Sequence, residues 1–191
     1  MNLKQAQILD AAFNLFYNHG FHAVGINEII KEANVAKKTL YNHFPSKNEL
    51  ILATLEQHHQ KIMLHINTKL TLAVPGKDAI LVLFECLDSW LNDQANELPV
   101  FNGCYFNKAH AEFSAVNPVI TSFCISHKQN IKAIFQDQVN DFEDDAEKNK
   151  LLTDLLILLR EGVLSDTLSL TKKNNAAQAI RFIENLLRFK R

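Results

Sequence analysis

Turn-forming residues are scarce in this chain, and their scarcity limits the folds open to it. Five glycines and four prolines occur among 191 residues, well below the roughly 12% of average usage. An all-β sandwich or barrel needs many turns, so neither is expected. Apolar residues instead recur at helical spacing along the chain, with no strand-like alternation and no repeat. The sequence therefore predicts an all-α fold of nine helices.

Composition and charge exclude several further classes. Apolar residues make up 47% of the sequence, which is too many for a disordered chain. The longest apolar run covers only residues 79–84, so we expect no membrane span. Amphipathic sequence begins at the N-terminus, so we expect no signal peptide and a cytoplasmic location. The net charge of -1 argues against coating of nucleic acid by bulk charge but allows a local basic patch.

Termination signals define the first helix. An amphipathic pattern predicts a helix over residues 4–19, and Gly20 stands where such a helix ends. Phe16 and Phe21 then fall at the two positions whose apolar contact closes a Schellman motif. We therefore expect the helix to end in that motif.

Two short helices are predicted next, over residues 26–33 and 37–43. Asn34 tolerates the left-handed conformation, so it suits a tight turn between them. Ser46-Lys47-Asn48-Glu49 is a capping box that opens a long helix. Five acids within residues 141–147 predict a solvated loop. The remaining helices are expected over residues 47–72, 78–93, 104–113, 118–142, 150–170 and 176–189.

Two short helices joined by a tight turn form a helix-turn-helix, whose second helix enters the major groove of DNA. The outward positions of the helix over residues 37–43 carry hydrogen-bonding side chains, and no acid lies between Ala33 and Ser46. Lys47 begins the next helix, where free N–H groups favour a phosphate. The alternative is an ordinary polar surface helix. The DNA-contact candidates are Lys37, Lys38, Thr39, Tyr41, Asn42, His43 and Lys47.

This stretch resembles the DNA-binding domain of the TetR family of bacterial transcriptional regulators. The resemblance covers about residues 5–52. At two positions the sequence departs from the family pattern: Asn34 replaces the usual glycine, and Ala36 replaces a common serine that would cap the recognition helix. The matching residues are Gly20-Phe21, Ala33-Asn34-Val35, Leu40-Tyr41-x-x-Phe44 and Ser46-Lys47-x-x-Leu50.

The resemblance implies a helix-turn-helix domain over residues 1–46 and a ligand-binding and dimerisation bundle over residues 47–191. It also implies a homodimer on a near-palindromic DNA operator. The expected activity is that of a repressor released by an apolar or aromatic small molecule, with no cofactor and no catalysis. The alternative is a helical enzyme or small-molecule carrier without DNA binding.

The same resemblance places a ligand inside the bundle and joins two chains by their last two helices. For both sets of residues, the alternative is packing in the chain's own core. The pocket candidates are Trp90, Tyr105, Phe106, His110, Phe113, Phe123 and His127. The dimer-interface candidates are Leu152, Leu156, Leu159, Val163, Ile180, Ile183 and Leu187.

Other chemistries lack a complete motif. Glu56-x-x-His59 is half of a di-iron signature, but the sequence holds no second copy. His58, His59 and His65 form no i,i+4 pair, so surface histidines and no metal site are expected. The three cysteines form no CxxC pair, and we expect buried packing thiols.

Overall fold

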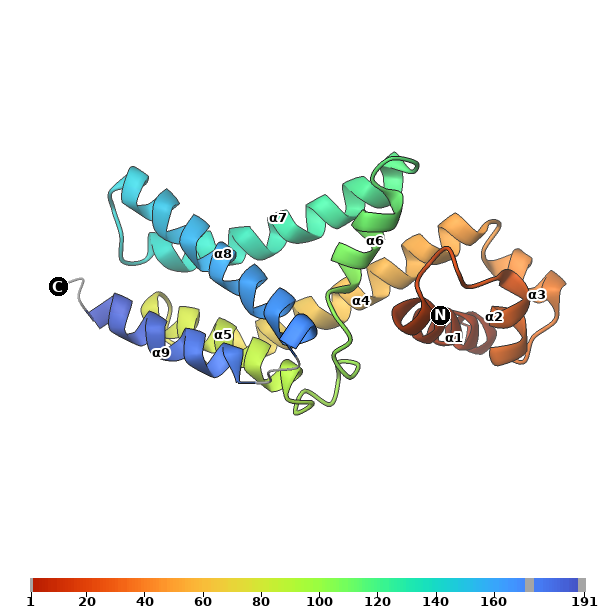
Figure 1. Ribbon diagram of the computed structural model, residues 1–191, viewed down its shortest axis with the longest axis horizontal. Helices are drawn as coiled ribbons and strands as arrows, with labels where there is room; N and C mark the ends of the chain where they lie inside the picture. The colour runs from red at the N-terminus through yellow and green to blue at the C-terminus, as the bar shows by residue number, and fades with distance from the viewer. Residues whose placement is uncertain (1, 171–173, 189–191) are drawn as a thin grey trace. The chain divides into compact units, whose positions relative to one another are not determined.

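The computed structural model describes residues 2–170 and 174–188 of the chain. Within these ranges it contains nine helices and no strand (Figure 1), which confirms the predicted all-α class. The predicted end of the last helix, at Phe189, lies outside the described residues. The helices are α1 (Leu3–His19), α2 (Ile26–Glu32), α3 (Lys37–His43), α4 (Lys47–Leu70), α5 (Lys77–Leu91), α6 (Tyr105–Phe113), α7 (Pro118–Asn140), α8 (Ala146–Leu170) and α9 (Asn175–Arg188).

Helix α1 ends at Gly20, as predicted, but without a Schellman motif. Gly20 has a φ of 89°, its N–H donates to Phe16 O at 2.9 Å, and the rings of Phe16 and Phe21 stack at 5.4 Å. A Schellman motif would also use the Phe21 N–H within the helix end. That N–H donates instead to Glu112 Oε1 on α6, at 2.9 Å. A contact from a distant helix therefore replaces the local motif.

The two turns of the helix-turn-helix segment follow the sequence signals. Asn34 adopts a φ of 50° between α2 and α3, which confirms the predicted left-handed turn. Ser46 Oγ accepts the Glu49 N–H at 3.1 Å and satisfies one of the free donors at the start of α4. Both turns therefore rest on local residues alone.

Helix α8 begins earlier than the sequence indicated. The acidic stretch was expected to remain a loop, but α8 starts at Ala146. Asp145 Oδ1 accepts the N–H groups of Glu147 and Lys148, both at 3.0 Å. Asp145 thus caps the helix, and Glu147 in its first turn favours the positive end of the helix dipole.

Packing divides the chain into two compact units. Unit 1 comprises Met1–Gln60 and Tyr105–His127, and unit 2 comprises Lys61–Cys104 and Lys128–Arg191. Helices α4 and α7 each contribute one part to each unit. These units group residues by packing, and the boundary after residue 46 stays a prediction.

The core of unit 1 is aromatic. Tyr105 is fully buried, and its ring lies 4.9 Å from the rings of both Phe13 and Phe21. Its hydroxyl lies 2.8 Å from the hydroxyl of Thr54, so the polar end of this buried ring is satisfied. Helix α6 is thereby held against the helices of the helix-turn-helix segment.

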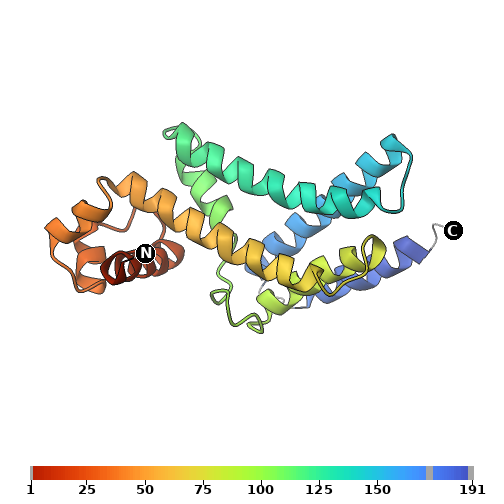
Figure 2. The ribbon, with the colours of Figure 1, turned by 180° about the vertical axis from the view of Figure 1, so that it is seen from behind.

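Unit 2 is a bundle of helices around a core that is mainly aliphatic but includes Phe84 and Phe135. Helix α9 packs against α5 and α8, and α5 and α9 run side by side in both views (Figures 1 and 2). Leu156, Ile183 and Leu187 are buried between them. Across residues 2–170 and 174–188, no helix is long and apolar enough to cross a membrane.

Candidate functional site

Helix α3 is an exposed basic helix held by apolar anchors. Leu40 is fully buried, and Ile29 of α2 is buried on the same side of the turn. The opposite face carries most of the predicted DNA-contact residues. Lys37, Lys38, Tyr41 and Asn42 are exposed, whereas Thr39 and His43 are half-buried.

The α3 helix therefore presents donors and cations to solvent. No carboxylate lies between Ala33 and Ser46 to neutralise them. Base edges and phosphates both accept hydrogen bonds from such side chains. The arrangement can bind a polyanion, and the small width of a helix suits the major groove.

Lys47 differs from the α3 residues because it is partly covered. Its Nζ lies 5.9 Å from the centre of the Phe16 ring. Burial lowers the pKa of its ammonium group, and Glu112 acts in the opposite direction. Phe16 thus fixes the Lys47 stem beside the N-terminus of α4.

Glu112 of α6 holds the loop between α1 and α2. Its carboxylate accepts the Phe21 N–H at 2.9 Å, the His22 N–H at 2.7 Å and the His22 Nδ1–H at 2.7 Å. We call this set of hydrogen bonds the Glu112 clamp. Burial alone would raise the pKa of the Glu112 carboxyl, but the three donors more than offset this and lower it.

A second contact from α6 ties down the end of α1. Lys108 Nζ donates to Tyr17 O, in the last turn of α1, at 2.9 Å. Sequence reasoning missed both Lys108 and Glu112, because their partners lie about ninety residues away along the chain. Only packing of α6 on α1 brings them together.

The predicted pocket residues are divided between the two units. Trp90 belongs to unit 2, and the other six belong to unit 1. Tyr105, Phe106 and Phe113 are buried in the aromatic core of unit 1, whereas His110 is exposed and Phe123 is half-buried. The structure thus does not gather the seven into one compact unit, and their role in binding a ligand stays a prediction.

Histidines of α4 are less exposed than the sequence suggested. His58 and His65 are buried, so the expectation of surface histidines is wrong for these two. His59 is half-buried, and its Nδ1 lies 2.9 Å from Nδ1 of His127. His127 is buried and stacks on Phe106 with 3.5 Å between ring centres.

Unit 2 contains a small, partly open cavity of about 30 Å³. Of the polar side chains that line it, Trp90 is a predicted pocket residue, whereas His65 and Arg160 are not. The Trp90 Nε1–H donates to Pro99 O at 2.8 Å, which fixes the ring at the cavity wall. The lining residues are Ile62, His65, Ile66, Leu83, Cys86, Leu87, Trp90, Leu98 and Arg160.

The predicted dimer residues mostly face the core of unit 2. Leu152, Leu156, Val163, Ile183 and Leu187 are buried within the single chain, and Leu159 and Ile180 are half-buried. The five buried residues therefore pack in the chain's own core, which is the alternative given above for these residues. A role of these five in contacting another chain would require the core to open.

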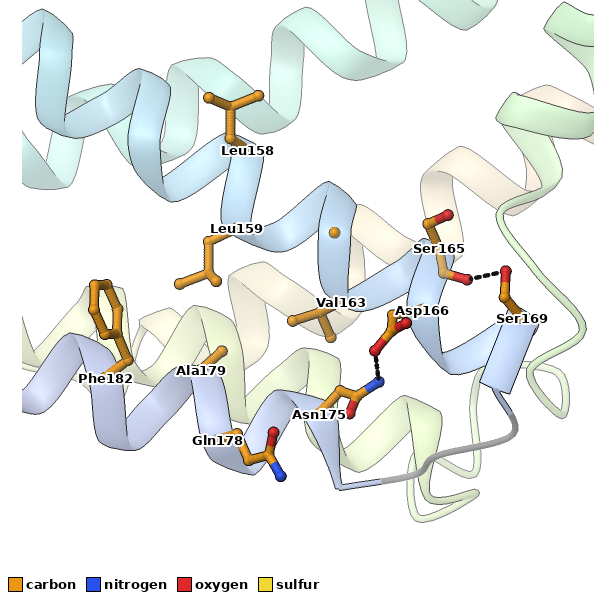
Figure 3. Close-up of a pocket in the computed structure, with 11 residues that line it drawn as sticks. Leu158, Leu159, Val163, Ser165, Asp166, Ser169, Asn175, Gln178, Ala179 and Phe182 are labelled. Carbon is orange, nitrogen blue, oxygen red and sulfur yellow. Dashed lines mark hydrogen bonds between the residues drawn. The ribbon is translucent and has the colours of Figure 1, made fainter.

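A different stripe of α8 is open to solvent. Leu151, Leu155 and Leu158 are 72%, 39% and 70% exposed, and Gly162 and Ser165 continue the same stripe. The stripe borders an open groove of about 630 Å³ between α8 and α9. Figure 3 shows Phe182 of α9 on the far side of this groove, where the ring is 52% exposed.

Polar contacts close one end of this groove. Asn175 Nδ2 donates to Asp166 Oδ2 at 2.8 Å, linking the start of α9 to α8 (Figure 3). Leu158 and Phe182 line the other end of the groove. The groove is therefore apolar at one end and polar at the other.

No group of three or more His, Cys, Asp or Glu side chains placed to hold a metal occurs in the part of the chain that the structure describes. The cysteines are free thiols: Cys86 and Cys124 are buried, and Cys104 is half-buried. Burial raises the pKa of Cys86 to about 11, so this thiol is protonated at neutral pH.

A helix-turn-helix with an exposed basic second helix, followed by a larger helical bundle, defines a class of DNA-binding regulators. Comparison with known proteins gives the family that the chain resembles. Residues 8–54 match the family described as bacterial regulatory proteins, tetR family, and a TetR-family transcriptional regulator of Streptomyces coelicolor has the same fold. That structure is 25% identical, with a TM-score of 0.86 over 97% of this chain and 94% of its own. The helix-turn-helix segment is thus similar to the DNA-binding domain of the TetR family, and the chain has the fold of a TetR-family regulator.

Curated relatives agree with this assignment. The HTH-type transcriptional activator FasR of Mycolicibacterium smegmatis is 29% identical over 63% of this chain. The HTH-type transcriptional regulator YxaF of Bacillus subtilis, itself uncharacterised, is 26% identical over 90% of it. The matches span 55% of the length of FasR and 87% of that of YxaF. Both relatives are named as transcriptional regulators.

Proposed function

We propose that the protein is a transcriptional repressor that binds a near-palindromic DNA operator as a homodimer and responds to a small molecule. The observation that carries the proposal is the exposed basic face of α3, supported on its other side by buried Leu40. The similarity to the TetR family supports the same conclusion. The alternative, a helical enzyme or carrier, gives no reason for an unopposed cationic helix in a helix-turn-helix.

The contacts divide by position on the helix. Recognition helices touch base edges with their N-terminal residues, so Lys37 and Lys38 are assigned to bases, together with the exposed Asn42. Tyr41 and Lys47 are assigned to phosphates, because Lys47 lies at the start of α4 where free N–H groups also favour an anion. Thr39 and His43 are half-buried and are assigned supporting contacts.

The second copy of the chain is assigned to the groove between α8 and α9. Leu151, Leu155 and Leu158 recur at i, i+4 and i+7 and end in Gly162, which allows a close helix approach. Leucines so exposed on one stripe are unusual for a surface that stays in water. In a two-fold dimer the same stripe of both subunits forms the interface. The exposed leucines of one subunit are then covered by the same stripe of the other.

Two bound subunits place their recognition helices in successive major grooves about 34–36 Å apart. Such a dimer on a promoter represses by excluding the polymerase. The relative FasR is named an activator, so the direction of control needs its own test. A transcription assay on an operator-bearing template gives it: less transcript with added protein supports repression, and more transcript contradicts it without touching the DNA-binding assignment.

Operator binding is tested with a duplex selected from a random pool. Removal of one phosphate contact by Lys47→Ala should weaken binding to all sequences and reduce the salt slope by about one unit. Lys38→Ala should instead relax preference at one base pair, with a loss of about 1–3 kcal/mol. Lys61→Ala is the matched control, because Lys61 is an exposed lysine on α4 outside the helix-turn-helix segment.

A further inference from the structure

Two buried polar side chains line the otherwise mostly apolar cavity of unit 2. His65 and Arg160 are 4% and 8% exposed, and both line the cavity. The rest of the wall is apolar or neutral, since the Cys86 thiol is protonated. Buried polar groups need partners, so the two side chains identify what the cavity can hold.

His65 has one nitrogen engaged and one without a partner. Its Nδ1–H donates to Glu97 Oε1 at 2.5 Å, because an ionised carboxylate can only accept. This hydrogen bond also lowers the pKa of Glu97. The other nitrogen, Nε2, is buried and has no hydrogen-bond partner among the described residues. Glu97 therefore fixes the ring so that Nε2 is left for the interior.

Arg160 supplies a positive charge at the same cavity. One of its nitrogens, Nη1, donates to Glu161 Oε1 at 2.7 Å. Glu161 also pairs with Lys128, so the Arg160–Glu161–Lys128 group keeps a net positive charge. A guanidinium carries five N–H donors in a fork that matches a carboxylate. Several of these donors are left after the bond to Glu161.

The size of the cavity limits the ligand. One water molecule needs a cavity volume of roughly 10–15 Å³. A cavity of about 30 Å³ therefore accommodates two or three non-hydrogen atoms. This is the size of a planar carboxylate, so an aliphatic chain attached to it needs additional room. A dianion would lose more hydration energy on entering the cavity than its attraction to Arg160 offsets, because Glu161 already pairs with that arginine.

We propose that the effector of this regulator is a short-chain aliphatic carboxylic acid whose carboxylate binds Arg160 and His65. The proposal deepens the ligand response in the proposed function and rests on it. The acid leaves its proton on His65 Nε2, which then donates to one carboxylate oxygen, while Arg160 donates to the other. The aliphatic chain lies against Ile62, Leu83, Leu87 and Trp90. Leu98 belongs to the loop after α5 and can yield to a chain of a few carbons.

The binding test uses the full-length protein and its single tryptophan. Fluorescence of Trp90 is followed while acetate, propionate or butyrate is added at constant ionic strength, with butyramide as the uncharged isostere of butyrate. We expect saturable binding of the acids that tightens by about fourfold per added methylene for as long as movement of Leu98 makes room for the chain. Butyramide should bind at least tenfold more weakly. Equal binding of butyramide and butyrate overturns the proposal, as does a chloride response of the same size.

Variants test the two polar groups. Arg160→Gln and His65→Leu should each weaken butyrate binding about 10- to 100-fold, because each removes a hydrogen bond to a charged group. Arg181→Gln is the control, since Arg181 is exposed on α9. Circular dichroism checks the fold. If Arg160→Gln does not fold, Arg160→Lys tests the same point, with weaker binding expected because lysine lacks the fork. Unchanged butyrate affinity in folded variants overturns the assignment.

The effector role is tested separately on DNA. Operator affinity is measured with and without butyrate, and a 5- to 150-fold change is the usual range for such coupling. Failure of DNA binding without any acid contradicts the proposed function and not the acid site. Acid binding that leaves operator affinity unchanged overturns the effector role.

Discussion

Loss of the Glu112 clamp should destabilise the loop that precedes α2. The carboxylate holds two backbone N–H groups and one imidazole N–H, at 2.7–2.9 Å. A hydrogen bond to a charged group contributes about 1.5–3 kcal/mol, and the bonds of His22 count for less because its side chain is 60% exposed. Glu112→Ala should therefore lower the free energy of unfolding by about 2–4 kcal/mol. Glu112→Gln keeps one acceptor and should lose roughly half as much.

The assay is urea denaturation followed by circular dichroism, with Glu56→Ala as the control. Glu56 is an exposed glutamate of α4 in the same unit, and its change should stay within about 0.5 kcal/mol of wild type. Operator affinity should fall in Glu112→Ala, because the loop positions α2 and α3. Wild-type stability in Glu112→Ala would refute the reasoning.

The clamp also predicts a pH dependence. The pKa of Glu112 is lower in the folded chain than in the unfolded chain, where it is about 4.3. Its stabilisation is therefore fully present above the unfolded-state pKa and is lost as the pH falls through the folded-state pKa. The difference in stability between wild type and Glu112→Gln should shrink as the pH is lowered below about 4. A constant difference across that range would contradict the assignment.

Two further outcomes follow from burial and backbone conformation. Leu158→Glu should yield a folded monomer in sedimentation, because Leu158 is 70% exposed. Leu156→Glu should instead unfold the chain, because a charge replaces a fully buried side chain. A dimeric Leu158→Glu protein would place the interface elsewhere. Asn34→Ala should lower the free energy of unfolding by about 1 kcal/mol in thermal denaturation, since alanine resists the φ of 50°, whereas Asn34→Gly should leave it unchanged. An equal loss in both variants would show that the Asn34 side chain, and not its backbone, matters.

Local signals predicted the fold well, because they act over a few residues. Gly20, Asn34 and Ser46 each set a turn or cap through their own backbone or side chain, and the structure has them as expected. The acidic run predicts a loop, but Asp145 caps α8, so the helix starts earlier than predicted. An acidic run serves either role, and here the backbone contacts of Asp145 decide which one.

Contacts between distant segments were not predictable from the same signals. The sequence gives no reason to connect Phe21 with Glu112, so the replacement of the Schellman motif was missed. Leucines surround most of α8, so periodicity alone does not say which stripe faces the core. The burial of Leu156 and the exposure of Leu158 depend on where α9 packs. His65 and Arg160 were missed for the same reason.

Operator recognition by α3 is measured most directly by fluorescence anisotropy of a labelled duplex selected from a random pool. The protein is titrated into this duplex and into a scrambled duplex of equal length at several salt concentrations. We expect the selected duplex to bind about 10³-fold or more tightly than the scrambled one, with affinity falling steeply as salt rises. Equal affinity for the two duplexes, or no binding to either, would contradict a DNA-reading role for α3.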